Sequence, residues 1–554
     1  MIDNSENQLE TTIAISEVSR TETSNWHETD WNYINKKVFN LQTRIAKAEK
    51  EGKGGKVKRL QNLLTRSTAA KKLAVRRVTE NQGAKTPGVD GETWNTPTAK
   101  TLAVETLKEE GYKPKPLKRV FIPKPNGKER PLGIPIMKDR AMQALHKLAV
   151  EPIAENNADP NSYGFRPYRS TADAMQQAYL MLSTKARPQW ILEGDIKGCF
   201  DNIDHEWLLA NVTMNSKVLR KWLKAGTLYQ GVYTDTMAGT PQGGIISPVL
   251  ANIALDGLEA TVKAKGKHYV IRYADDFIVT GYSKEELEAI KPVIEDFMKE
   301  RGLTLSPEKT KITHINDGFD FLGWNFRKHD GKLLTKPSKA NIQTFLTEIR
   351  ETIKNMATAK QEDMIDVLNP KIRGWANYHK GTVAKEAFNQ VDHEIWKALW
   401  NWCKRRHPNK PENWIQARYW MRKDGRNWVF VSKKRQLIKA KDTKIVRHIK
   451  TPNALNPFIP TDRKKLDELR KRRTKRILFG TVKELWERQE GNCPNCHQRI
   501  TEESEWHKHH IQPKSQGGND ELDNLILVCP ACHSQIHNPI YRDNAGSRKG
   551  LIKA

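Results

Sequence analysis

The sequence contains no uninterrupted apolar run of about 18 residues, the length that a membrane-spanning helix requires. Hydrophobic residues make up 37% of the 554 positions and the mean hydropathy is −0.73, so we expect a soluble protein with a large polar surface. The start of the chain, Met1 to Glu6, is acidic and polar and does not have the basic and apolar regions of a secretory signal. We therefore expect a cytoplasmic protein that does not enter a membrane.

Cysteine is scarce, with six residues in the chain. Four of the six form two Cys-x-x-Cys pairs near the C-terminus: Cys493, Cys496, Cys529 and Cys532. This spacing is typical of a metal site in a reducing compartment and argues against a disulfide framework. Four thiolates complete a tetrahedral zinc site, so we expect a closed, structural Zn²⁺ centre.

Acidic residues are too few to balance the basic ones: 65 Asp and Glu stand against 94 Lys and Arg, and the formal net charge is +29. Such an excess disfavours a compact state unless a polyanion lies close by. Nucleic acid is the leading partner. A membrane surface is the second, but no basic amphipathic anchor with aromatic residues on its apolar face stands out. The basic clusters in 404–476 either contact the phosphate backbone of a nucleic acid or form a solvated surface.

The most informative stretch is Tyr273-Ala274-Asp275-Asp276, which lies between two short apolar runs rich in β-branched residues. This pattern predicts a tight hairpin with two carboxylates at its tip. Two adjacent acids repel each other unless a divalent cation neutralises them, although an Asp-Asp turn can also be merely solvated. A third acid, Asp195, ends another strand-like run. Three such acids meeting in one place would form the two-metal cage that nucleotidyl transfer requires.

Three further side chains are candidates for nucleotide binding. A basic hairpin is predicted over residues 118–135, where Lys124 and Arg130 can clamp a triphosphate, unless the hairpin is simply exposed. Phe200 follows Asp195 closely and can block a 2′-hydroxyl, or it packs in the core. Gln242 lies in a glycine-rich loop whose backbone can approach a nascent base pair closely.

Helical periodicity frames this central region. Residues 1–24 are polar, and their hydrophobic residues do not recur at a helical or strand spacing, so we expect this stretch to be disordered. An amphipathic helix then begins near Trp31, and a second basic helix follows. Beyond residue 338 the chain is again helical and rich in Trp and Tyr. Aromatic residues at this density either pack in a core or contact RNA.

The sequence resembles the reverse transcriptases encoded by group II introns. The resemblance rests on Tyr163-Gly164-Phe165-Arg166-Pro167, Gly239-Thr240-Pro241-Gln242-Gly243 and Tyr273-Ala274-Asp275-Asp276, in that order. It implies an α+β multidomain protein with right-hand polymerase fingers and palm, a helical thumb or maturase domain and a basic DNA-binding segment. It further implies that Asp195, Asp275 and Asp276 bind two Mg²⁺ ions, that Phe200 is the sugar gate, and that Gln242 lies near the incoming dNTP.

The C-terminal region resembles an HNH endonuclease, a zinc-stabilised ββα-metal finger. The resemblance implies that His510 is the general base that activates water and that Asn524 orients it. His509 and His533 would hold one divalent cation, Mg²⁺ or Mn²⁺, at the scissile phosphate. The family often has Asp where this chain has His509, and His533 and His537 can instead pack beside the zinc.

These readings predict six regions and a function. The regions are a disordered 1–24, an RNA-binding helical extension 25–85, fingers and palm 86–335, maturase or thumb 336–403, a DNA-binding segment 404–476 and an HNH endonuclease 477–554. The predicted function is RNA-directed DNA polymerisation and splicing assistance for a mobile group II intron, with nicking of target DNA to prime reverse transcription. The expected partners are intron RNA, double-stranded target DNA and dNTPs, within a nucleoid-associated bacterial ribonucleoprotein.

Two alternatives remain open at this point. One is a retron- or defence-type reverse transcriptase that works without an intron. The other is an RNA-binding splicing chaperone whose polymerase is inactive, although the presence of all three acids argues against decay. Nothing in the sequence indicates the oligomeric state.

Overall fold

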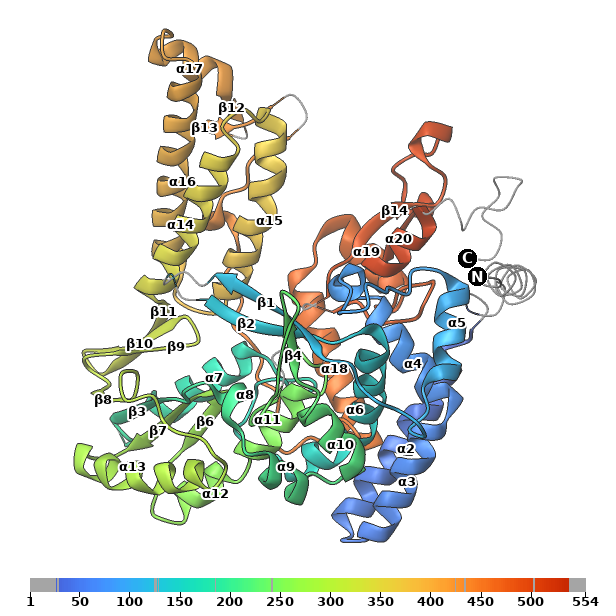
Figure 1. Cartoon of the computed structure of the whole chain (residues 1–554). Helices are drawn as coiled ribbons and strands as arrows, with labels where there is room; N and C mark the ends of the chain where they lie inside the picture. Colours follow the sequence, from blue (N-terminus) through green and yellow to red (C-terminus); the bar gives the residue numbers. More distant parts are fainter. Residues whose placement is uncertain are drawn as a thin grey trace.

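The computed structural model describes residue 26 and residues 29–123, 127, 129–184, 186–240, 243–423, 425–432, 435–501 and 504–537. The predictions for residues 1–24, Lys124 and Gln242 lie outside these residues. Helices and strands are mixed along the chain, which confirms the predicted α+β class (Figure 1). Among the described residues no helix is both long and apolar enough to cross a bilayer.

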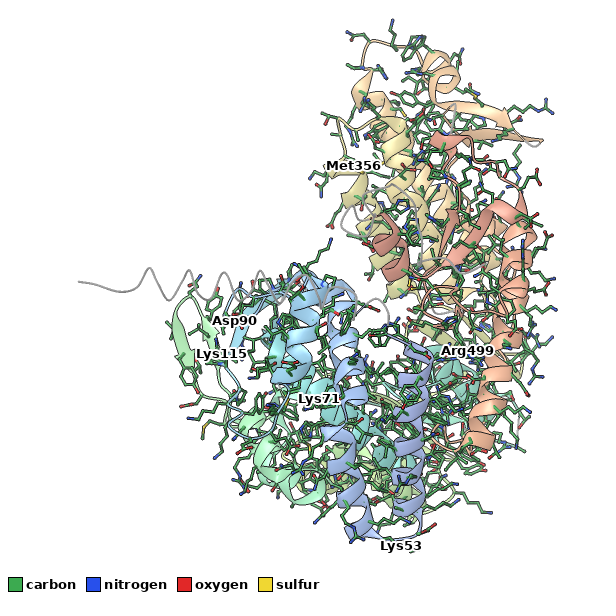
Figure 2. The ribbon with its side chains drawn as sticks, turned by 90° about the vertical axis from the view of Figure 1, so that its right-hand side faces the viewer. Lys53, Lys71, Asp90, Lys115, Met356 and Arg499 are labelled. Carbon is green, nitrogen blue, oxygen red and sulfur yellow. The ribbon has the colours of Figure 1, made fainter. Side chains whose placement is uncertain are left out.

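The N-terminal helices form one layer along the side of the molecule. Their amphipathic faces are buried: Ile34, Val38, Leu41 and Ile45 recur on one stripe of the first helix. Figure 2 shows this layer, with Lys53 at the tip of the first helical hairpin. This layer shares a continuous apolar core with the rest of the body. Its elements are α2 (Trp31–Lys50), α3 (Gly54–Arg66), α4 (Thr68–Thr79), η1 (Gln82–Lys85), α5 (Pro97–Thr106) and α6 (Met137–Asn157).

The centre of the body is an antiparallel sheet in the order β6-β7-β3-β8. Its two faces belong to different cores, because alternate residues of a strand point to opposite sides. Leu192 packs toward α13 and the N-terminal core, whereas Ile191 packs toward α7. The strands are β3 (Trp190–Asp195), β6 (Val270–Tyr273), β7 (Asp276–Gly281) and β8 (Lys311–His314). The helices are α7 (Thr171–Leu182), α8 (Cys199–Asn202), α9 (His205–Asn211), α10 (Ser216–Leu223), α11 (Ser247–Leu255), α12 (Leu258–Lys263) and α13 (Lys284–Lys299).

Two smaller sheets flank the central one. The predicted basic hairpin is present and extends into a sheet of order β2-β1-β4-β5. The second small sheet, in the order β11-β10-β9, leads into the helical domain. The strands are β1 (Leu117–Pro123), β2 (Glu129–Ile134), β4 (Thr227–Tyr229), β5 (Val232–Thr234), β9 (Phe319–Phe321), β10 (Trp324–His329) and β11 (Lys332–Pro337).

A helical domain rises from the body and has its own core (Figure 1). That core continues past residue 404, where the sequence predicts a boundary, and includes Ile415, Tyr419, Phe430 and Ala440. The first part of the predicted DNA-binding segment therefore packs with these helices. The elements are α14 (Lys339–Asn355), α15 (Gln361–His379), α16 (Lys385–Arg406), α17 (Glu412–Tyr419), β12 (Trp420–Lys423), β13 (Arg426–Phe430) and η2 (Ala440–Asp442).

The second part of that segment returns to the body through a buried carboxylate. Asp173 is fully buried and accepts from Thr451 N at 2.6 Å and from Arg473 Nη2 at 2.8 Å, and it contacts His448 Nε2 at 2.9 Å. Burial opposes ionisation, but the hydrogen bond from His448 and the charge of Arg473 lower the pKa of Asp173 below its usual range. The basic helix α18 (Pro460–Ile477) is thereby fastened to the same body as the central sheet.

The C-terminal module is small and has its own core. Strand β14 pairs antiparallel with β15, and α20 follows directly, which gives a ββα order. The elements are α19 (Gly480–Arg488), β14 (His507–His510), η3 (Lys514–Gln516), η4 (Leu522–Asn524), β15 (Leu525–Val528) and α20 (Pro530–His537).

Gly164 lies in close contact with the turn that carries Asp275. Tyr163 N donates to Arg272 O at 2.9 Å, so this segment runs along the edge of β6. A Cβ added to Gly164 would lie 2.2 Å from Ala274 N, at the turn that carries Asp275. Only glycine permits that approach.

We therefore predict that Gly164→Ala moves the turn, lowers the melting temperature and reduces primer extension by at least about tenfold, because small displacements of reacting groups are costly. Gly374→Ala is the matched control. A Cβ there meets nothing within 4 Å, and its helical site in α15 favours alanine. Thermal unfolding and primer extension on both variants test this, and wild-type behaviour of Gly164→Ala would contradict it.

Candidate functional site

The three predicted acids meet at one end of the central sheet. Strand β3 pairs with β7 in a register that places Asp195 opposite Asp276, and Asp275 precedes β7 in the turn. Ala274 adopts a positive φ of 57° in this turn and is almost fully buried. A non-glycine residue adopts this conformation only where its surroundings hold it.

Desolvation and the proximity of the carboxylates raise the pKa values of Asp275 and Asp276. Desolvation, followed by repulsion from Asp275 and Asp195, raises the pKa of Asp276 to about 6, although the residue as a whole is exposed. Desolvation and the Asp195 charge also raise the pKa of Asp275. Three carboxylates gathered in one place are a donor set that fits divalent cations, which supply the missing positive charge.

Two basic side chains reach toward this cluster. Lys309 Nζ lies 3.0 Å from Asp195 Oδ2, and this hydrogen bond raises the pKa of Lys309. The segment that carries Lys309 is fixed because Ser306 N donates to Asp195 O at 2.8 Å. The charge of Arg130, on β2, partly offsets the rise in the pKa of Asp275, so Arg130 lies close enough to act on the cluster.

The other polymerase motifs gather around Phe200. The Phe165 ring lies 6.2 Å from that of Phe200 in an edge-to-face arrangement. Thr240 N donates to Phe200 O at 2.6 Å, and a Cβ on Gly239 would come within 2.5 Å of the same oxygen. A Cβ on Gly243 would come within 2.7 Å of Gly133 O, in β2. The glycine-rich loop thus lies between Phe200 and the basic hairpin.

The four cysteines come together as a second site. Cys493, Cys496, Cys529 and Cys532 are all buried, and their sulfurs lie within 4.8 Å of one another. Such a group suits a tetrahedral ion held by thiolates, which is how structural zinc is bound.

The four-cysteine site also lies against the N-terminal layer. Arg76 is a buried residue of α4. Burial lowers the pKa of its guanidinium, but the Glu80 carboxylate and the Cys496 sulfur outweigh this effect and raise that pKa. The Arg76 guanidinium also bonds Glu80 at 2.8 Å and lies over the Trp31 ring at 4.3 Å. The C-terminal module therefore contacts α4 beside its four-cysteine group.

A third site is formed by histidines from β14 and α20. Ligand nitrogens of His509, His533 and His537 lie within 4.8 Å of one another, separate from the cysteine group. The structure thus brings His509 and His533 together as predicted, and it adds His537. The signal for His537 is its spacing of four residues from His533, which places both on one helix face. The same spacing also fits the alternative in which His533 and His537 pack beside the zinc. The sequence therefore predicts a shared helix face but does not identify His537 as a ligand.

His510 points to the opposite side of β14 from His509. Its Nε2 lies 2.7 Å from Asp520 Oδ1. Lys514 and His510 lower the pKa of Asp520 to about 2, so Asp520 is an ionised partner for the ring. Asp520 has no signal in the sequence, because a lone acid in a polar loop forms no distinguishing pattern. Asn524 Oδ1 accepts from Gln512 N at 2.7 Å and therefore holds the chain just after β14.

Four protein families match this chain in succession. Residues 26–107 match "N-terminal domain of reverse transcriptase" and residues 122–326 match "Reverse transcriptase (RNA-dependent DNA polymerase)". Residues 342–420 match "Group II intron, maturase-specific domain" and residues 493–539 match "HNH endonuclease".

Individual relatives agree with these families. Protein YkfC of Escherichia coli is 37% identical over 318 residues, which are 48% of this chain and 82% of the relative. The group II intron-encoded protein LtrA of Lactococcus lactis is 29% identical over 423 residues, 58% of this chain and 70% of LtrA. The chain belongs to the group II intron-encoded proteins. An uncharacterised 91 kDa protein in the cob intron of Schizosaccharomyces pombe is 28% identical over 396 residues, 55% of this chain and 49% of that protein.

This group II intron-encoded protein is thus a reverse transcriptase with a maturase domain and a DNA endonuclease domain, as its sequence predicts. The retron-type and inactive-chaperone alternatives gain no support from these matches. The families also use divalent metals, in agreement with the acidic cluster and the histidine group.

The acidic cluster generates a pH prediction. The pKa of Asp276 is raised above its unfolded value, so ionised Asp276 destabilises the fold above pH about 6, and this cost disappears as the pH falls toward the unfolded pKa of about 3.9. In Mg²⁺-free buffer, Asp276→Asn should melt above wild type at pH 8, with the difference shrinking toward pH 5. Thermal unfolding across this range checks it, and a pH-independent difference would contradict it.

The histidine group generates a second prediction. His537→Ala removes one of three nitrogens, so we expect Mn²⁺ affinity of the C-terminal module to fall at least about tenfold while primer extension is unchanged. Exposed His329 on β10 provides the control variant His329→Ala. Isothermal titration of the full chain with Mn²⁺ checks this, and equal affinities for the two variants would exclude His537 as a ligand.

Proposed function

We propose that the central sheet is the palm of a right-hand polymerase, with the β2-β1-β4-β5 sheet and its helices as fingers and the helical domain as thumb. The proposed regions are 25–85 for RNA binding, 86–335 for fingers and palm, 336–403 for maturase or thumb, 404–476 for DNA contacts and 477–554 for the nuclease. The register that sets Asp195 opposite Asp276 is the observation that carries this proposal.

In the palm, Asp195, Asp275 and Asp276 would hold two Mg²⁺ ions. When bound, such a pair stabilises the attacking and leaving oxygens of nucleotidyl transfer. Lys309 contacts Asp195 from a side chain that is largely exposed, so it can also reach a phosphate that enters the cluster. Arg130, together with the predicted Lys124, would hold the triphosphate of the incoming dNTP from the opposite wall.

Phe200 would select the sugar. Its ring lies edge-to-face against Phe165, and its backbone oxygen accepts from Thr240 N in the glycine-rich loop, so both its ring and its backbone have fixed neighbours. A ring fixed next to the acidic cluster leaves no room for a 2′-hydroxyl, which favours dNTPs over ribonucleotides. Gln242, in the same loop, would lie at the nascent base pair.

In the nuclease, His509, His533 and His537 would hold one divalent cation, which stabilises charge on the scissile phosphate when bound. Three imidazoles suit a transition-metal ion such as Mn²⁺ better than Mg²⁺. His510 would take the proton from water. Its Nε2 contact with Asp520 favours the tautomer that donates to the carboxylate and stabilises the ring once it is protonated. Asn524 would fix the position of this strand end, and Zn²⁺ on the four cysteines would hold the fold.

The activities follow one another in this proposal. The N-terminal layer and the helical domain bind intron RNA, and splicing chemistry itself belongs to the RNA. After intron RNA is inserted into one strand of double-stranded target DNA, the nuclease nicks the other strand. The new 3′-hydroxyl then primes copying in the palm. This order fits a bacterial, nucleoid-associated ribonucleoprotein.

The two active sites should be separable by mutation. Asp275→Ala should lower poly(rA)/oligo(dT) extension more than about a hundredfold, because several kcal/mol of transition-state stabilisation are lost, and should leave nicking of double-stranded DNA intact. His510→Ala should abolish nicking of double-stranded DNA and leave poly(rA)/oligo(dT) extension intact. Extension that survives in Asp275→Ala would remove the palm assignment, and nicking that survives in His510→Ala would place the general base elsewhere.

A further inference from the structure

The β12–β13 hairpin lies beside α16 at the end of the helical domain that is away from the central sheet (Figure 1). Four tryptophans of these elements meet there. Trp396 and Trp400 come from α16, and Trp420 and Trp428 come from the β12–β13 hairpin. Trp428 lies 5.8 Å from Trp396, 5.6 Å from Trp400 and 6.0 Å from Trp420, measured between ring centroids. Side chains at this density usually fill a core. Here they leave a space open.

That space is a cavity of about 240 Å³ between α16 and the hairpin. Its aromatic wall is formed by Trp396, Trp420, Trp428 and Phe430, and Lys439 and Lys441 also line it. Small-molecule sites commonly enclose about 300–1,000 Å³. A cavity somewhat below that range suits one planar ring system.

The backbone of Trp428 supports a role beyond packing. Its φ is +58°, a conformation that L-residues rarely adopt, and the hairpin register is irregular between Met421 and Lys423. The strained backbone holds a ring that is still 37% exposed. Strain of this kind persists where the surroundings enforce it, and it concentrates at ligand sites.

The lysines are also held in place. Asp392 Oδ1 accepts from Ala440 N at 2.7 Å, and Asp392 Oδ2 accepts from Lys441 N at 3.0 Å. Arg426 bonds Asp442 at 2.6 Å and so ties the hairpin to the same segment. Burial, and then the neighbouring Lys441 charge, lower the pKa of Lys439. Asp392 also lines the cavity, but both of its oxygens already accept from these backbone N–H groups. The half-buried Lys439 and the exposed Lys441 therefore leave positive charge at the cavity that favours an anionic ligand.

We propose that this cavity binds one unpaired nucleobase of RNA, with the base against the tryptophans and its phosphate on Lys439 and Lys441. Aromatic faces stack on any base, and lysines pair with the backbone without reading sequence. Unpaired bases in RNA loops and bulges are the ones that proteins can take up in this way. The choice of RNA as the polyanion rests on the proposed function; the shape and charge of the cavity do not depend on it.

The test uses the full-length protein and a single-stranded RNA oligonucleotide that carries one 2-aminopurine, whose fluorescence falls when the base stacks. Trp428→Ala should weaken binding about tenfold and reduce the quenching, whereas Trp428→Phe should retain both. Trp414→Ala is the matched control, because Trp414 is also 37% exposed but lies on α17 outside the cavity wall. It should behave as wild type.

The charge is tested separately, in a variant that keeps the aromatic wall. Lys439→Ala with Lys441→Ala should lower the salt dependence of binding, with the slope of log K against log salt falling by about 1.4. Asp275→Ala, which removes a proposed palm ligand and keeps the cavity, should bind and quench the oligonucleotide as wild type does, so a failed palm assignment would not be mistaken for a failed cavity.

Three results would overturn the inference. Trp428→Ala could match Trp414→Ala in affinity and quenching. A duplex RNA or a single-stranded DNA of the same sequence could bind as tightly and with the same loss in Trp428→Ala. Free AMP or UMP could displace the oligonucleotide completely at micromolar concentration, which would indicate a mononucleotide site.

Discussion

Repulsion among three carboxylates is the constraint on which the polymerase body depends. The register of β3 and β7 fixes Asp195 opposite Asp276, and the Ala274 turn adds Asp275. The sheet therefore brings together charges that disfavour one another, and this costs stability until a cation neutralises them. The surrounding structure makes the arrangement persist: helices cover one face of the sheet, and the strand-like segment with Gly164 supports the turn.

The other modules are joined to this body rather than attached by free linkers. The N-terminal helices share its apolar core, so RNA contacts on that layer would act directly on the palm. Asp173 fastens α18 through His448, Thr451 and Arg473. Arg76 links α4 to the cysteine site of the nuclease. A chain that must act on RNA and then on DNA thus presents its sites from one connected scaffold.

Local patterns predicted much of this structure. The apolar runs around Asp195 and Asp275 correctly predicted two strands, and the basic pattern of residues 118–135 correctly predicted the β1–β2 hairpin. The amphipathic period predicted α2, and the spacing of the cysteine pairs predicted that the four thiols come together. Contacts between distant segments could not be predicted in the same way. Asp520, for example, reaches His510 across a loop. The core that continues past residue 404 and the strained Trp428 depend on tertiary packing, which has no period in the sequence. The domain boundaries and catalytic roles stay predictions.

The central claim is that Asp195, Asp275 and Asp276 hold a pair of cations about 3.5–4 Å apart. Electron paramagnetic resonance of the full-length protein with Mn²⁺, a chain-terminated primer–template and the next dNTP tests it most directly. Two Mn²⁺ ions at that separation are exchange-coupled, whereas single ions on the histidine or cysteine groups are not. The account predicts a coupled signal in wild type that disappears in Asp195→Asn and remains in His537→Ala. A coupled signal that survives in Asp195→Asn, or none in wild type, would contradict it.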